Sequence, residues 1–155
     1  MTGQTELPSF SLVLREGISG GFKGPQLREH IQIENVDNGV AVMHALPASD
    51  PQDGFTTMSG TIADKQDLHS FVAGLEKTLQ MLPVESPEGS EDIYGEDISI
   101  AFYSSETDFQ WRNGGPDGCG GGESSVKATP EQKQIFRELV STIRAMVGNQ
   151  QLQAN

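Results

Sequence analysis

The chain has 155 residues, which is the usual size of one domain, and its 22 acidic side chains against 10 basic ones give a net charge of −12. A chain of this length can bury a core without metals or disulfides, so we expect one domain over residues 1–155, with a core from about residue 9 to 148. The negative charge opposes phosphate backbones and anionic lipids. It therefore argues against nucleic acid and membranes as partners.

The first eight residues have no basic start and no apolar run, so they predict neither a signal peptide nor an anchor. The single cysteine, Cys119, cannot form an internal disulfide, which favours a reducing compartment and hence a cytoplasmic protein. The 18 glycines and 8 prolines indicate long loops. We expect flexible segments at residues 1–8, 84–97, 113–127 and 149–155.

Alternating apolar residues predict three antiparallel strands in the first third of the chain. These strands cover residues 10–15, 30–36 and 40–46. Asn38-Gly39 supplies the positive φ angles of a tight hairpin between the last two. The glycine-rich residues 19–25 predict a turn or an open loop.

Residues 47–60 are rich in Pro, Asp, Gly, Ser and Thr, and we expect a loop there. A helix is predicted over residues 64–82, because its apolar residues recur at spacings of three and four, and Pro83 ends it. The apolar stripe comprises Leu68, Phe71, Val72, Leu75, Leu79 and Leu82.

The acidic residues 84–97 carry no basic side chain and predict a mobile connection that buries little. Alternation then predicts a second hairpin over residues 98–102 and 109–111, with Trp111 as a core residue. Residues 113–125 contain so much glycine that we expect disorder.

The last predicted element is a helix that begins after Thr129, which caps it together with Gln132, and ends at Gly148-Asn149. The order of elements is therefore βββαββα, without a βαβ repeat. This order predicts an α+β fold, in which an antiparallel sheet of about five strands carries two helices on one face.

Two short motifs match the letters of functional sites but not their structural context. Gly17-Ile18-Ser19-Gly20-Gly21 fits G-x-S-x-G, yet no helix can start promptly after Ser19, and a hydrolase of that class needs a far longer chain. Residues 21–24 fit the G-x-x-G loop of nucleic-acid-binding KH domains, which works in a positive field and joins two helices. Here the motif follows a strand in an acidic chain.

No metal-binding signature is present either. His30, His44 and His69 are scattered, and Cys119 lies among glycines that would hold a thiol too loosely for catalysis. The acidic residues 85–97 lack the ligand spacing of an EF-hand loop. We therefore expect a protein without catalytic residues, metal or cofactor, which is not an enzyme.

The stretch Ser19-Gly20-Gly21-Phe22-Lys23-Gly24 resembles the emfourin family, small protein inhibitors of thermolysin-like metallopeptidases such as protealysin. Those proteins open with a short strand that runs into a Gly-Gly-Phe-Ala-Gly turn, and Lys23 takes the place of the alanine. The later order of elements is similar, with residues 92–94 approximating the start of the hairpin. This chain differs by an N-terminal arm, the loop at residues 48–60 and the glycine-rich insertion around Cys119.

The resemblance implies an inhibitor that blocks the active-site cleft of such a peptidase. Phe22 would either pin the turn to the core or fill a subsite, and a carboxylate of the acidic segment would be a second contact. The alternative is a non-catalytic acidic interaction domain, an adaptor or a complex subunit, and either form would be a monomer or a weak oligomer. The implied contact residues are Gly20, Gly21, Phe22, Lys23 and Gly24.

Overall fold

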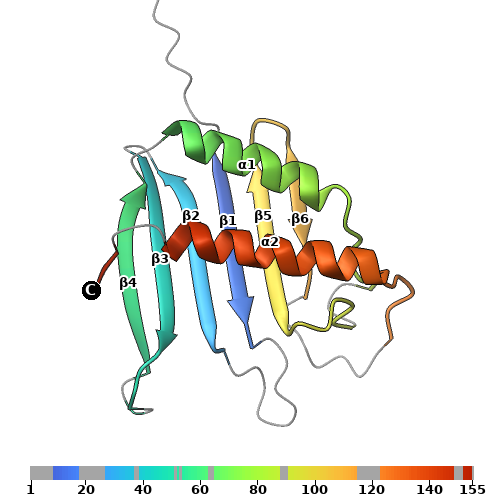
Figure 1. Ribbon diagram of the computed structural model, residues 1–155, viewed down its shortest axis with the longest axis horizontal. Helices are drawn as coiled ribbons and strands as arrows, with labels where there is room; N and C mark the ends of the chain where they lie inside the picture. Colours follow the sequence, from blue (N-terminus) through green and yellow to red (C-terminus); the bar gives the residue numbers. More distant parts are fainter. Residues whose placement is uncertain are drawn as a thin grey trace, which may run out of the picture.

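The computed structural model describes most of the chain, namely residues 9–17, 27–36, 39–50, 52, 54–62, 65–87, 91–114, 123–148 and 152–154. The predicted α+β class is confirmed (Figure 1). The elements are β1 (Phe10–Glu16), β2 (Glu29–Val36), β3 (Gly39–Pro47), β4 (Phe55–Ile62), α1 (Lys65–Leu79), β5 (Ile98–Ser104), β6 (Phe109–Arg112), α2 (Pro130–Gly148) and β7 (Gln153–Ala154).

All strands belong to one antiparallel sheet in the order β6-β5-β1-β2-β3-β4-β7. The chain builds β1 to β4 as neighbours and then crosses over through α1, so that β5 pairs with the other side of β1. The end of β1 therefore lies between the starts of two other strands, because Glu16 is opposite Glu29 of β2 and opposite Ile98 of β5.

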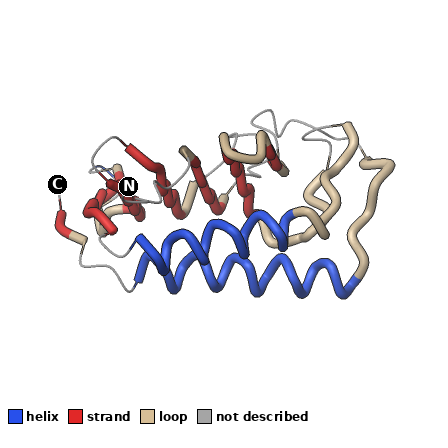
Figure 2. Tube along the Cα trace, turned by 90° about the horizontal axis from the view of Figure 1, so that it is seen from above, coloured by secondary structure: helices blue, strands red, loops and turns tan. Residues whose placement is uncertain are grey.

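Both helices lie on the same face of the sheet, as predicted (Figure 2). Alternate strand residues such as Leu14, Ile31 and Ile100 are fully buried on that face, where they meet the apolar stripes of the helices. The capping box that starts α2 is also confirmed. Gln132 N–H donates to Thr129 Oγ1 at 3.1 Å, and Thr129 N–H donates to Gln132 Oε1 at 2.8 Å.

The loop expected over residues 47–60 is wrong in its second half, because β4 is a strand that pairs with β3 from Val40–Ile62 to Pro47–Phe55. Its threonines favour a strand, but β4 lies near the sheet edge and buries only Ile62, so it lacks the alternation that marks a half-buried strand. With β4 and the short β7, the sheet has seven strands rather than about five.

The expectation that residues 84–97 bury little is also wrong. Ile93 and Tyr94 are buried, the Tyr94 ring stacks on Phe136 with centroids 4.2 Å apart, and the Tyr94 hydroxyl donates to the carbonyl of Pro83. The carboxylate of Asp92 accepts the N–H groups of Gly95 and Asp97. The expectation rested on the high acidic content of the segment and overlooked the apolar pair Ile93-Tyr94, which anchors it to α2.

Both ends of the glycine-rich insertion are fixed to the segment after α1. Gly114 N–H donates to the buried Glu85 carboxylate at 2.7 Å, and the Ser86 N–H donates to the buried Ser124 hydroxyl at 2.9 Å. Residues 115–122, which include Cys119, lie outside the described residues, so the disorder predicted there stays a prediction. Trp111 is a core residue, as predicted.

Helix α1 ends at Leu79 and not at residue 82, because the chain turns before Pro83. Leu82 is nevertheless buried in the core. The carbonyl of Leu82 accepts the indole N–H of Trp111 at 3.1 Å, so this turn satisfies a buried polar group.

Candidate functional site

The implied contact residues, Gly20 to Gly24, and the motif residue Ser19 fall within residues 18–26, outside the described residues. The structure does describe both strand ends that flank this segment. Gly17 N–H donates to the carbonyl of Asp97 at 2.9 Å, and Arg28 N–H donates to the carbonyl of Glu16 at 2.7 Å. The chain therefore leaves β1 and returns to β2 at two hydrogen-bonded points in the middle of the sheet.

Gly17 has a φ angle of 98°, in the left-handed region that side chains rarely adopt. Gly17 itself is buried. The backbone therefore requires a glycine at position 17. In the sequence, Gly17 was noted only as part of the G-x-S-x-G match.

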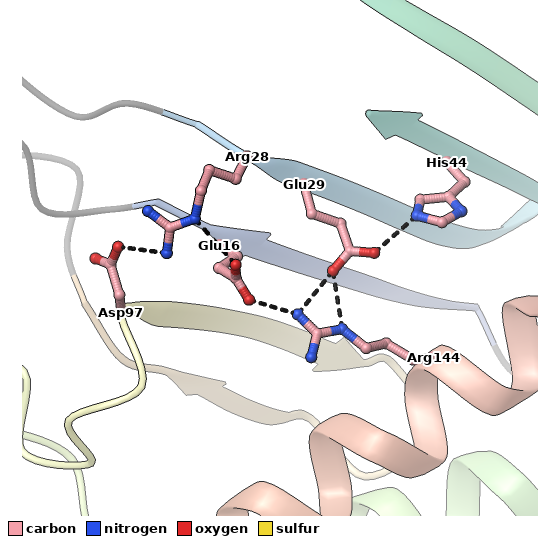
Figure 3. A network of polar contacts seen from close by, with 6 residues as sticks. All are labelled: Glu16, Arg28, Glu29, His44, Asp97 and Arg144. Carbon is pink, nitrogen blue, oxygen red and sulfur yellow. Dashed lines mark hydrogen bonds and ion pairs between the residues drawn. The ribbon is translucent and has the colours of Figure 1, made fainter. Parts of the chain in front are cut away.

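A network of carboxylates and arginines surrounds these strand ends (Figure 3). Arg28 Nε lies 3.1 Å from Glu16 Oε2, and Arg28 Nη2 lies 2.9 Å from Asp97 Oδ2. One guanidinium thus joins the end of β1 to the turn before β5. We call this group the arginine network; it comprises Glu16, Arg28, Glu29, His44, Asp97 and Arg144.

Helix α2 enters the arginine network through Arg144. Its Nη2 lies 2.7 Å from Glu16 Oε1, its Nε lies 2.9 Å from Glu29 Oε1, and Glu29 Oε2 lies 2.8 Å from His44 Nε2. Glu16, Glu29 and His44 each follow or precede a buried residue by two positions on their strand, so they lie on the helix-covered face. The network therefore links α2 to the facing ends of β1 and β2.

The protonation of Glu16 reflects this setting. Burial raises the pKa of Glu16, but the hydrogen bonds and positive charges of Arg144 and Arg28 outweigh it and hold the pKa below its usual value of 4.5. Burial likewise lowers the pKa of Arg144, whereas its bonds to the two glutamates raise the pKa above its usual value overall. The charged carboxylate is thus the favoured state of Glu16.

A depressed carboxyl pKa contributes stability that is complete above the unfolded pKa and is lost as the pH falls through the folded one. We expect Glu16→Gln to be less stable than the wild type at neutral pH, and we expect this difference to shrink below about pH 4.5. Urea unfolding of both proteins between about pH 7 and pH 3 measures it. A difference that stays constant over this range would contradict the assigned role of Glu16.

A second surface feature is a groove of about 500 Å³ between α1 and α2. Phe71 and Ile135 form part of its walls, and Met81 is 56% exposed at its border. Gly74 also lines the groove, and a Cβ atom added there would meet no atom within 4 Å. The sequence did not predict this groove, because the apolar stripes of both helices were expected to pack on the sheet. Gly74 on α1 and Met81 just after it are its sequence signals.

The histidines do not come together. His30 is opposite Ala45 and His44 is opposite Ile31, so the two side chains lie on opposite faces of the sheet, while His69 is exposed on α1. Among the described residues, no three His, Cys, Asp or Glu side chains are arranged to hold a metal ion.

The described carboxylates of the acidic segment are engaged with the protein itself. Glu91 forms an ion pair with Lys127 at 2.6 Å, and Glu96 forms one with Arg137 of α2 at 3.3 Å. The acidic segment thus faces basic side chains of the following arm and helix. No helix in the described part of the chain is long and apolar enough to cross a membrane.

Comparison with known proteins adds no relative: no family model matches the chain, and neither a curated protein nor a solved structure matches it. The resemblance to the emfourin family therefore continues to rest on residues 19–24 and on the order of the elements around them.

Proposed function

We propose that the protein is a non-catalytic, cytoplasmic inhibitor of a thermolysin-like metallopeptidase that blocks the active-site cleft with residues 20–24. One observation supports this proposal most. The two strand ends that flank these residues are held by two backbone hydrogen bonds, Gly17 to Asp97 and Arg28 to Glu16, and by the arginine network around them.

A short inhibitory segment needs such support for a physical reason. Ordering a chain segment at an interface costs conformational entropy, and this cost is lower when the segment already has both ends fixed. Here β1 and β2 are adjacent in the middle of the sheet, and Arg28 and Arg144 hold Glu16 from two directions. Both ends of the segment are therefore held in place before a partner binds.

The acidic character of the chain supports a protein partner over other macromolecules. The net charge of −12 repels nucleic acid and anionic lipid, whereas a protein cleft that contains a metal ion or basic side chains attracts it.

The proposal is tested by titrating a thermolysin-like metallopeptidase with the purified protein and following peptide hydrolysis. We expect inhibition at a 1:1 ratio, and we expect Phe22→Ala to raise the inhibition constant by about tenfold or more. Phe55→Ala is the matched control, because Phe55 is 44% exposed on β4 and lies near the other end of the sheet order. A wild type that does not inhibit at micromolar concentration would rule the proposal out.

Melting curves of the two variants separate the two roles of Phe22. A loss of inhibition without a change in Tm indicates that Phe22 contacts the peptidase, whereas a loss of both indicates that it pins the turn. Either result is compatible with cleft blocking, since the segment needs both a contact and a fixed shape.

The groove between α1 and α2 favours the second candidate, a general interaction domain, because it offers apolar walls to a partner segment. Gly74→Leu places an apolar side chain in this groove, where the added Cβ meets no atom within 4 Å. Under the inhibitor proposal this variant inhibits the peptidase as well as the wild type does. Loss of inhibition in Gly74→Leu would indicate that the binding surface lies on the helices and not at residues 20–24.

A further inference from the structure

One edge of the sheet is formed by β4 together with the short strand β7, which covers only part of it. In the part of the chain that the structure describes, β7 covers the outer side of β4 over only two residue pairs, Met58–Ala154 and Ser59–Gln153. Among the described residues, the other positions of β4 pair only with β3, on the inner side. Figure 1 shows this arrangement, with the short C-terminal strand beside β4 and neither helix lying over that edge.

The chemistry of β4 lacks the usual protection of a sheet edge. Natural edge strands carry charges, prolines or bulges that prevent pairing with another chain, but the eight residues Phe55–Ile62 include no charge and no proline. Two exposed large side chains, Leu46 at 42% and Phe55 at 44%, lie at the same corner of the sheet. The edge that β7 occupies is therefore open to a longer strand.

We propose that β4 is a dimerisation edge, where β4 of a second copy pairs with it in antiparallel direction and displaces β7. Such a dimer has a two-fold axis perpendicular to the sheet, and this axis keeps each side chain on its own face. Even-numbered residues must therefore pair with even-numbered residues of the other copy, and odd-numbered with odd-numbered. An axis at Ser59 pairs residues 56–62 throughout and is centred where β7 now lies. Ser59 then faces its own counterpart, and Thr57 faces Thr61 of the second copy.

This register is why a second copy fits the edge. Threonine pairs across strands stabilise antiparallel sheets, and Thr56 would face Ile62 of the second copy, which joins two good strand formers. No charged pair is created along the seven paired residues, so the net charge of −12 per copy acts only over longer, salt-screened distances. The competing β7 keeps the dimer weak.

The test uses analytical ultracentrifugation of the full chain at protein concentrations between about 5 and 500 µM. Gln153→Pro removes a backbone donor from β7, and we expect it to tighten dimerisation by about tenfold or more, because the edge is uncovered. A Gln153→Pro variant that remains monomeric over the whole range would overturn the proposal.

Two double variants in the Gln153→Pro background test the register. Thr57→Lys with Thr61→Lys sets like charges opposite each other twice, and we expect it to abolish the dimer. Thr57→Lys with Thr61→Glu changes the same positions but sets opposite charges together, and we expect it to retain the dimer. Equal behaviour of the two variants would overturn the register, and circular dichroism confirms that both are folded. The proposed inhibitory residues 20–24 lie between β1 and β2 in the chain and not on β4, so failure here leaves the proposed function untouched.

Discussion

Phe136→Ala is expected to lower the free energy of unfolding by about 3–5 kcal/mol, as large aromatic truncations in well-packed cores do. Phe136 is fully buried on α2, and its ring stacks on Tyr94 with an angle of 11° between the planes. The truncation therefore leaves a cavity and also releases the anchor of residues 91–97. Urea unfolding followed by circular dichroism at neutral pH measures the loss.

Two further variants show whether the loss arises from that packing. Phe136→Leu keeps most of the buried volume and is expected to cost less than about 2 kcal/mol. Phe55→Ala truncates a phenylalanine that is 44% exposed, and a change within about 0.5 kcal/mol is expected. A Phe136→Ala protein whose free energy of unfolding lies within about 1 kcal/mol of the wild type would show that α2 is not packed on Tyr94.

Asn113→Ala is expected to destabilise the protein by about 2–4 kcal/mol, although the residue lies just beyond β6. The Asn113 side chain is buried, its Oδ1 accepts the N–H of Ile100 at 2.7 Å, and its Nδ2 donates to the carbonyl of Ile98 at 3.0 Å. Alanine leaves both backbone groups of β5 without these partners in the core. Urea unfolding again provides the measurement.

Asn113→Asp is an instructive control because it changes only one group. At neutral pH the carboxylate can accept from Ile100 but repels the carbonyl of Ile98, so we expect this variant to be destabilised too. Burial next to a carbonyl raises the pKa of such a carboxyl, and its protonated form can donate to Ile98. The gap to the wild type should therefore narrow as the pH falls, and a gap that does not change with pH would contradict the assigned bonds.

The sequence predicted those parts of the fold in which the hydrophobic pattern is strong. The alternation in β1 and β5, and the stripes of α1 and α2, follow directly from burial on one face. The sequence did not predict β4, because a strand near the edge of a sheet buries little on either side and the composition then favoured a loop. The burial of Ile93 and Tyr94 was not predicted, because the acidic side chains around the pair dominate the composition of the segment.

The surroundings of the candidate site could not be predicted from sequence for a different reason. Glu16 and Glu29 become opposite neighbours only through the strand register, and Arg144 reaches them from a helix more than one hundred residues later. No local pattern encodes such contacts. The glycine motif at residues 20–24 was visible in the sequence, but the fixed strand ends on which it is mounted required the three-dimensional arrangement.

The central claim is that residues 20–24 enter the cleft of a thermolysin-like metallopeptidase, and competition for that cleft tests it most directly. Calorimetry is carried out with the free peptidase and with the same peptidase saturated by a small zinc-binding inhibitor. We predict that the protein binds the free enzyme at a 1:1 ratio and does not bind the saturated one. Undiminished binding to the saturated peptidase, or no binding to either form, would contradict the account.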